Sequence, residues 1–181
     1  MRLFALCLSA LIIVGCASTA PTVAQVTGPQ SWGSADNVMH IENLYFSEQP
    51  DQAGLQAARA NGITTIVNLR GPQELDWDES AIVNDAGMRY INIPISGRSD
   101  TLDPNVMQQI STTIESLAGE NVLVHCASGN RAAAWYATHL VDRRGMSESQ
   151  ATSIAESVGL TSDGMKQRLH NFFSSPSPSD F

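Results

Sequence analysis

Apolar runs alternate with stretches of helical periodicity through the middle of the 181-residue chain. Short apolar and β-branched runs predict strands at 38–41, 43–46, 63–69, 88–93 and 121–125. The stretches between and after them predict helices at 51–61, 74–86, 104–117, 132–140, 147–158 and 162–173. This alternation indicates a single three-layer α/β domain, in which helices flank both faces of a mainly parallel sheet.

The segment HCASGNR, from His125 to Arg131, joins the last predicted strand to a predicted helix. Ligands of open α/β sheets bind beyond the carboxyl ends of the strands, so this loop lies where a site is expected. Backbone N–H groups at a helix start have no intrahelical partners and attract anions. Gly129 allows a positive φ, which lets the loop aim its amides inward. The segment is therefore typical of an anion cradle.

Cys126 and Arg131 supply the chemistry of that cradle. A cysteine beside a cation at a helix amino terminus ionises more readily than a free thiol, and the thiolate is the nucleophile. Arg131 presents a planar fork of donors that matches two oxygens of a phosphate or a similar oxyanion. His125 is expected to orient the loop or to tune the thiolate. The alternative is a buried, inert Cys126, since free cysteines are commonly buried.

The amino terminus has the pattern of an export signal. Arg2 precedes an apolar run over 3–14, which is too short to span a membrane. The residues Ile13 to Cys16 resemble a bacterial lipobox, which implies cleavage before Cys16 and anchoring through acyl chains on that cysteine. An ordinary secretory signal, cut further along, is the alternative. Ala17 favours the periplasmic face of the outer membrane of a Gram-negative cell envelope.

These signals divide the chain into four parts. They are a lipoprotein signal peptide at 1–15, lipidated Cys16 with a flexible tether at 16–35, a folded domain at 36–173 and a disordered tail at 174–181. With Cys7 removed and Cys16 acylated, Cys126 is the one free thiol expected. This excludes an internal disulfide and a cysteine-rich zinc site, and no metal or cofactor is expected.

The charge balance limits the partners. The formal net charge is −8, and the sequence has no basic cluster, so nucleic acid is not an expected partner. A small oxyanion or a phosphorylated substrate would bind through a local arginine site. The sequence does not identify a protein partner.

Several segments occur in the order known from one bacterial family: YFSEQP (45–50), GITTIVNLR (62–70), Glu74, YINIPI (90–95) and VLVHCASGNR (122–131). Over residues 36–160, the chain resembles the phosphatase-like domain of beta-lactamase-hydrolase-like proteins, within the cysteine-dependent tyrosine and dual-specificity phosphatase fold. The resemblance implies that Cys126 is the nucleophile and Arg131 the oxyanion ligand. The cradle would then be lined by the amides of Ala127, Ser128, Gly129, Asn130 and Arg131.

Two positions depart from the usual pattern of cysteine phosphatases. Four residues separate Cys126 from Arg131, where phosphatases usually have five, and this shorter spacing is similar to that of rhodanese-type sulfurtransferases. The Ser or Thr that commonly follows the arginine is replaced by Ala132. Ser128 is the candidate substitute for that hydroxyl.

The same resemblance implies a general acid in the loop after the fourth predicted strand, where Asp100 and Asp103 are candidates. Asp103 stands before Pro104 as a helix N-cap stands before a first-turn proline, so Asp100 is preferred as the acid. Arg70 ends an earlier strand on the same edge of the sheet. It is expected to hold the cradle or to pair with Glu74, and we include it among the candidate substrate-binding residues with His125.

The sequence thus supports three functions for one thiolate site. The first is a phosphatase-like hydrolase that uses Cys126, Arg131 and Asp100. The second is a sulfurtransferase that carries sulfur as a Cys126 persulfide and needs no carboxylic acid. The third is a noncatalytic module that binds anions in the same pocket.

Overall fold

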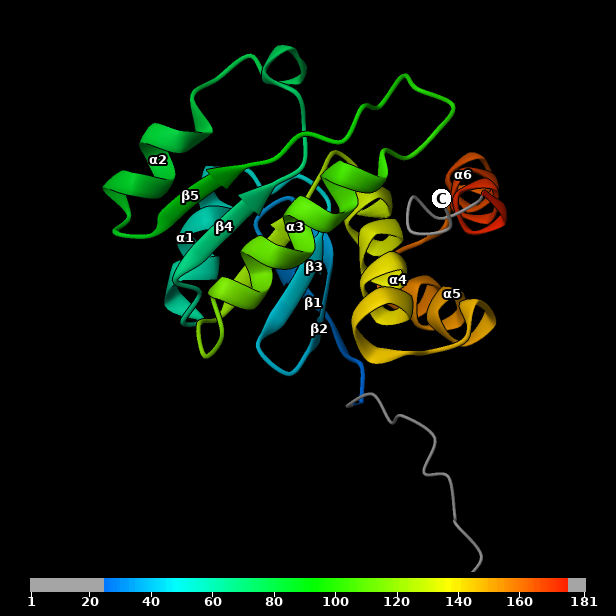
Figure 1. Cartoon of the computed structure of the whole chain (residues 1–181). Coiled ribbons are helices and arrows are strands. Elements are labelled where there is room, and N and C mark those ends of the chain that lie inside the picture. Colours follow the sequence, from blue (N-terminus) through cyan, green and yellow to red (C-terminus); the bar gives the residue numbers. More distant parts are fainter. Residues whose placement is uncertain (1–24, 176–181) are drawn as a thin grey trace, which may run out of the picture.

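The computed structural model describes residues 25–175, which contain one six-stranded sheet with helices on both faces (Figure 1). The strands are β1 (Thr27–Trp32), β2 (Ala35–Ile41), β3 (Leu44–Ser47), β4 (Thr65–Asn68), β5 (Arg89–Asn92) and β6 (Val122–His125). Their order across the sheet is β1-β2-β3-β6-β4-β5. The last four in this order pair in parallel, whereas β1 with β2 and β2 with β3 pair antiparallel. The mainly parallel sheet expected from the sequence is confirmed.

The helices form the two outer layers. They are α1 (Gln52–Ala60), the short 3-10 helix η1 (Pro72–Glu74), α2 (Glu79–Asp85), α3 (Pro104–Ser116), α4 (Asn130–Arg144), α5 (Glu148–Ser157) and α6 (Asp163–Ser174). Helices α1 and α2 cover one face of the sheet, α3 and α4 cover the other, and α5 and α6 pack against α4 (Figure 1). No helix within residues 25–175 is both long enough and apolar enough to cross a membrane.

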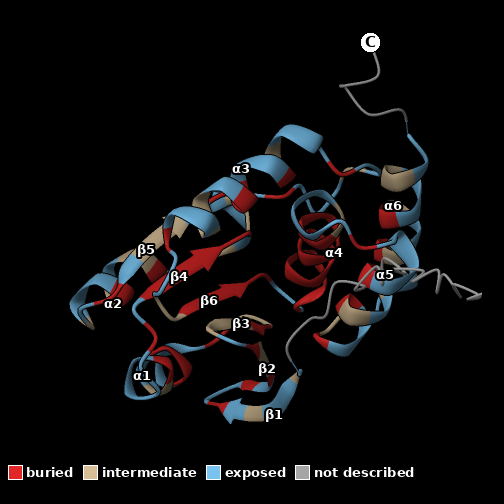
Figure 2. Cartoon of the chain, turned by 60° about the horizontal axis from the view of Figure 1, so that its bottom comes forward, coloured by how far each residue is buried: buried red, intermediate tan, exposed pale blue. Residues whose placement is uncertain are grey.

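The central strands β4 and β6 are buried on both faces (Figure 2). Ile66 and Leu123 belong to the core beneath α1 and α2, while Val67 and Val124 belong to the core beneath α3 and α4. Successive side chains of a strand point to opposite faces, so a strand covered on both sides needs a continuous apolar run. This requirement explains the unbroken hydrophobic runs in the sequence.

The folded domain begins before residue 36, which corrects the predicted tether. Strand β1 lies within the segment expected to be flexible, and it pairs with β2. Trp32 is 3% exposed, with its ring centroid 5.5 Å from that of Tyr45. The low charge and the Ser, Thr, Gly and Pro content suggested a tether, but strand pairing and the burial of Trp32 hold this segment in the sheet. The predicted signal peptide, Cys16 and residues 176–181 lie outside the described residues.

The helix predicted at 74–86 is shorter than expected. Helix α2 begins only after Asp78, whose carboxylate accepts a hydrogen bond from the Ala81 N–H at 3.0 Å. Glu74 ends the separate helix η1, and its carboxylate lies 2.6 Å from Arg131. Because this partner is 57 residues away along the chain, the local pattern could not show that Glu74 leaves the helix.

Polar residues end the parallel strands at one level of the sheet. In the strand register, Ser47 and Asn68 both lie opposite His125, and Asn92 lies opposite Asn68. The HCASGNR loop starts from the middle of this row. The expected position of the HCASGNR loop at the carboxyl edge of the sheet is therefore confirmed.

Replacing Trp32 with Ala tests whether β1 belongs to the folded unit. Loss of a buried tryptophan should lower the free energy of unfolding by about 3–5 kcal/mol, measured by urea denaturation. The matched control is Thr27→Ala, because Thr27 is exposed in the same strand and should change stability by less than about 0.5 kcal/mol. Equal stability of both variants and the wild type would mean that this segment is only a tether.

Candidate active site

The HCASGNR loop turns sharply between β6 and α4. Gly129 is the N-cap of α4 and has a φ of 78°, a conformation that glycine adopts without strain. The helical hydrogen bonds of α4 begin with the bond from the Ala133 N–H to the Gly129 carbonyl at 3.0 Å. The N–H groups of Asn130 and Arg131 therefore have no acceptor within the helix, as an anion cradle requires.

The segment after β3 supports the other side of the loop. Glu48 forms an isolated antiparallel bridge with Ser128, and the Gln49 N–H donates to the Ala127 carbonyl at 3.4 Å. Ala127 and Ser128 are exposed, whereas Cys126 and Gly129 are buried. The loop thus presents its centre to solvent and keeps its two ends inside the protein.

Arg131 is held by acceptors from three parts of the chain. Its Nη1 donates to Glu74 Oε1 at 2.8 Å and to the Ile95 carbonyl at 2.9 Å, and it lies 3.3 Å from the Leu69 carbonyl. Its Nη2 donates to Glu74 Oε2 at 2.6 Å. The two contacts with Glu74 make a bidentate pair, the geometry in which arginine and carboxylate are most strongly oriented. The guanidinium is therefore fixed before any ligand arrives.

Cys126 lies next to this guanidinium and is only 1% exposed. Burial by itself lowers the pKa of Arg131, but the Glu74 hydrogen bond and the proximity of Cys126 more than offset this, so the pKa is raised. The cation and the candidate nucleophile therefore lie close enough to interact. The structure brings together the two residues on which the sequence motif was based.

Glu74 is the acidic partner that the site needs. The Arg131 hydrogen bond, opposed by burial and aided by the Gly71 N–H and the charge of Arg70, lowers the pKa of Glu74 to about 2. Arg70 Nε is 3.7 Å from Glu74 Oε2, and Arg70 Nη1 donates to Gln49 Oε1 at 2.8 Å. Arg70 therefore braces the loops around the cradle and pairs with Glu74, as its position predicted.

His125 faces away from the cradle, toward the buried carboxylate of Glu79. It shares the sheet face of Leu123, and its Nε2 lies 3.2 Å from Glu79 Oε1, with the ring turned from ideal hydrogen-bond geometry. Both side chains are fully buried. The structure places His125 behind the loop, where it supports Cys126 from the other face and does not line the anion site.

Glu79 is the shared hydrogen-bond acceptor of several polar side chains beneath the site. Its carboxylate accepts from Gln49 Nε2 at 2.7 Å, from Asn68 Nδ2 at 2.5 Å and from the Tyr90 hydroxyl at 3.3 Å. Burial raises the pKa of Glu79, but the nearby His125, together with the hydrogen bonds from Gln49 and Asn68, outweighs this effect and lowers the pKa. Sequence reasoning missed Glu79. The one available signal was that His125 and Asn68 end apolar strands and would need buried partners.

The loop between β5 and α3 lies against the Arg131–Glu74 pair. A Cβ added at Gly97 would stand 3.7 Å from Arg131 Nη1 and 3.8 Å from Glu74 Oε1. Asp100 is in this loop, is exposed, and makes no hydrogen bond or ion pair with another residue of 25–175. Asp103 is the N-cap of α3, where it accepts from the Asn105 N–H at 2.9 Å, as predicted.

Asn130 ties the cradle to the start of α6. Its Oδ1 accepts from the N–H groups of Thr161 and Ser162 at 2.8 and 2.7 Å. Its Nδ2 points to Ser128, with 3.2 Å to the Ser128 hydroxyl. Asn130 was predicted only to line the cradle with its amide, but its side chain also joins two loops that are 31 residues apart.

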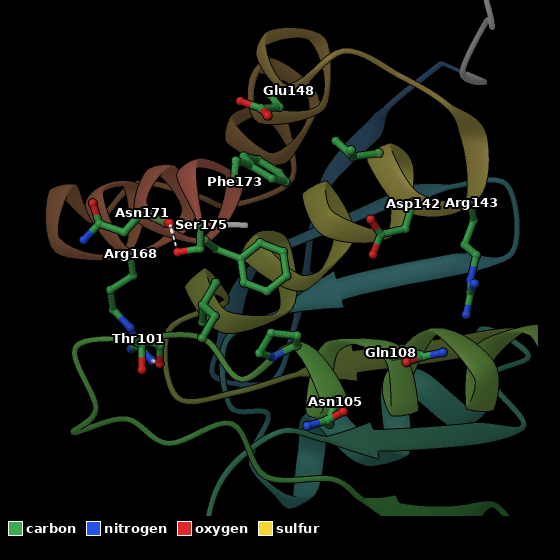
Figure 3. A pocket seen from close by; sticks show the side chains of 14 residues that line it. Thr101, Asn105, Gln108, Asp142, Arg143, Glu148, Arg168, Asn171, Phe173 and Ser175 are labelled. Carbon is green, nitrogen blue, oxygen red and sulfur yellow. Dashed lines mark hydrogen bonds between the residues drawn. The ribbon is translucent and has the colours of Figure 1, made fainter. Parts of the chain in front are cut away.

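Within residues 25–175, no group of three or more His, Cys, Asp or Glu residues is arranged to hold a metal ion. A cavity of about 670 Å³ lies beside the site and is not lined by the HCASGNR loop. It is bounded by the end of the Asp100 loop and by α3, α4, α5 and α6 (Figure 3). This cavity is therefore separate from the anion cradle.

A central parallel strand that enters a cysteine–arginine loop at the start of a helix is the arrangement of the cysteine-dependent tyrosine and dual-specificity phosphatase fold. Solved structures of this fold are similar to the chain. P. aeruginosa TpbA has a TM-score of 0.65 at 19% identity, over 85% of this chain and 91% of that chain. The kinase associated phosphatase KAP, with its catalytic-site cysteine replaced by serine, has a TM-score of 0.62 at 17% identity, over 84% and 96%.

The chain belongs to the family described as beta-lactamase hydrolase-like protein, phosphatase-like domain, whose model matches residues 36–141. A beta-lactamase hydrolase-like protein of Xylella fastidiosa (strain Temecula1) is 32% identical over 126 residues, which cover 66% of this chain. The match spans only 28% of that relative's length. The family resemblance expected from the sequence motifs is confirmed for this domain.

The ionised Glu74–Arg131 pair predicts a characteristic pH dependence of stability. The pKa of Glu74 falls from 4.5 to about 2 on folding, so its stabilising contribution is complete above about pH 4.5 and is lost as the pH falls toward 2. Glu74→Gln should therefore reduce the free energy of unfolding at neutral pH, and the gap to the wild type should narrow as the solution is acidified. Urea denaturation at a series of pH values measures this gap.

The control for this experiment is Glu115→Gln. Glu115 pairs with Arg143 on the surface, so its loss should cost less than about 1 kcal/mol. A gap between the wild type and Glu74→Gln that stayed constant between about pH 7 and pH 3 would contradict an ionised pair at Arg131.

Proposed function

We propose that this domain is a cysteine-dependent hydrolase of phosphate monoesters. The observation that carries the proposal is the fixed guanidinium of Arg131 beside the Cys126 sulfur, at a helix start with free N–H groups. Acceptors on three residues, Leu69, Glu74 and Ile95, hold the guanidinium through Nη1 and Nη2, and its remaining N–H groups would bind the oxyanion. Such preorganised donors stabilise negative charge in a transition state without rearranging.

In the proposed reaction, the Cys126 thiolate attacks phosphorus. A sulfur–phosphorus bond forms as the bond to the leaving oxygen breaks, and Asp100 gives its proton to that oxygen. Water then attacks the phosphorus of the thiophosphate, the sulfur–phosphorus bond breaks, and Asp100 takes the proton from water. Arg131 binds the equatorial oxygens throughout. The exposure of Asp100 and the contact of its loop with Arg131 support this assignment.

The relatives support a phosphorylated substrate. A cysteine-to-serine variant of TpbA, similar to this chain with a TM-score of 0.55, was crystallised with phosphotyrosine. KAP is itself described as a phosphatase. We therefore propose aryl phosphates, including phosphotyrosine, as the first substrates to test.

The second candidate function is sulfur transfer, and the short loop favours it. Only four residues separate Cys126 from Arg131, a spacing that encloses a smaller anion. In that reaction Cys126 takes a sulfane sulfur from thiosulfate, sulfite leaves from Arg131, and a thiophilic acceptor such as cyanide removes the sulfur from the persulfide. Asp100 has no part in this route.

Parallel assays distinguish these functions. The wild type should release phosphate from phenyl phosphate, Cys126→Ser should release none, and Asp100→Asn should be about 10²- to 10⁴-fold slower. Thiosulfate with cyanide should yield no thiocyanate. Thiocyanate production that depends on Cys126, without release of phosphate, would instead establish the transferase. A reduced thiol that turns over neither compound but binds phosphate would indicate a noncatalytic module.

We also propose that the chain is lipidated at Cys16 and anchored in the cell envelope, at the periplasmic face of the outer membrane. The support is the lipobox-like sequence before Cys16 and the Ala that follows it.

Full-length protein expressed in a Gram-negative host should incorporate an alkyne fatty acid and fractionate with the outer membrane. Cys16→Ser should lose the label, whereas the matched control Cys7→Ser should keep it. Label retained by Cys16→Ser would rule out this anchor.

A further inference from the structure

One arginine of the last helix holds the loop that carries Asp100. Arg168, in α6, donates through a single nitrogen, Nη2, to the carbonyls of Ser96 and Thr101, each at 3.0 Å. These two carbonyls are the two ends of the segment that contains Asp100. Figure 3 shows the Arg168 side chain extending from α6 toward Thr101 at the margin of the cavity.

The segment from Ser96 to Thr101 depends on this contact. Its other hydrogen bonds are internal: the Ser96 hydroxyl accepts from the N–H groups of Arg98 and Ser99, and the Ser99 hydroxyl accepts from the Thr101 N–H. Within residues 25–175, every hydrogen bond from this segment to another part of the chain comes from Arg168. Local turns shape the loop, Arg131 holds Ile95 directly before it, and Arg168 holds its two ends.

Arg168 is itself fixed relative to the cradle. Asn130, in the HCASGNR loop, binds the N–H groups of Thr161 and Ser162 and so fixes the start of α6. Met165 and Leu169 are buried on the inner face of α6 and belong to the same core as Cys126. A continuous set of contacts therefore runs from the cradle through α6 to the Asp100 loop.

The stability of the fold alone does not explain why position 168 is an arginine. Its Nε is buried without a hydrogen-bond partner, and no carboxylate within the described residues forms an ion pair with it. Burial, and after it the like charge of Arg131, lowers the pKa of Arg168, whereas Asp100 has the opposite effect. The Arg168 side chain is thus partly buried and loses hydration without gaining an ion-pair partner.

We infer that Arg168 is a positioning residue, which holds the Asp100 loop at a fixed place relative to Cys126 and Arg131 so that Asp100 can protonate the leaving group. This inference rests on the proposed phosphatase function. It assigns a role in that reaction to a helix that lies outside the sequence motif. Arg168 acts through the loop backbone and does not itself contact the reacting atoms.

The dependence of rate on the leaving group tests the inference. Phenyl phosphate needs a proton on its leaving oxygen, whereas dinitrophenyl phosphate leaves readily without one. The ratio kcat/KM reports the steps up to formation of the thiophosphate, so Arg168→Gln should lower kcat/KM for phenyl phosphate by about 10-fold or more and leave kcat/KM for dinitrophenyl phosphate within about 3-fold. Arg168→Lys keeps the charge but not the planar fork, and should give a smaller change in the same direction.

The matched control is Arg143→Gln, which removes another arginine from the margin of the same cavity. Arg143 pairs with the surface residue Glu115, and both substrates should react as with the wild type. Thermal unfolding shows whether each variant is folded. An equal loss of kcat/KM on both substrates by folded Arg168→Gln or Arg168→Lys would overturn the inference.

A double-mutant cycle with Asp100 separates this inference from the proposed function. If Arg168 acts through Asp100, Arg168→Gln should change the rate of Asp100→Asn by less than about 2-fold. Independent, multiplicative losses would refute the link. The proposed function fails if the wild type shows no Cys126-dependent release of phosphate. The Arg168 inference alone fails if Asp100→Asn loses activity while Arg168→Gln keeps the wild-type dependence on leaving group.

Discussion

The bidentate contact between Arg131 and Glu74 is the interaction on which the rest of the site depends. Arg131 is the second residue of α4, yet its guanidinium also bonds the carbonyl that precedes the Asp100 loop and approaches the carbonyl that ends β4. One side chain therefore sets the relative positions of three loops around Cys126. Without Glu74, Arg131 would be a buried cation without an anion. It would then no longer fix the positions of the cradle and the adjoining loop.

Two carboxylates interact with the polar and charged groups of the site, one on each side of the HCASGNR loop. Glu74 orients the cation that would meet a substrate, and it is partly exposed. Glu79 is fully buried, accepts hydrogen bonds from Asn68 and Gln49 beneath the loop, and lies 3.2 Å from His125 Nε2. Because unpaired polar groups are costly inside a protein, this network also rigidifies the strand ends from which the loops start.

The sequence was sufficient for features that depend on neighbouring residues. The alternation of strands and helices, the N-cap role of Asp103 and the juxtaposition of Cys126 with Arg131 all follow from short-range pattern or spacing. The contacts that complete the site come from distant segments, and no local period encodes them. Glu79 follows an ordinary helix N-cap, and Arg168 is one charged residue of an amphipathic helix. The helix predicted from residue 74 began too early for the same reason, since a distant arginine binds Glu74.

The register of the parallel strands limits how the length of this chain can change. Asn68, His125 and Asn92 lie in one row, and the residues after them enter the site. Deleting one residue within β4 would move its end by about 3.3 Å and turn every later side chain of the strand to the opposite face. Asn68 would then leave Glu79, and the Leu69 carbonyl would leave Arg131. Insertions and deletions among relatives with the same site should therefore fall in the connections that precede the strands, and not within the strands or immediately after them.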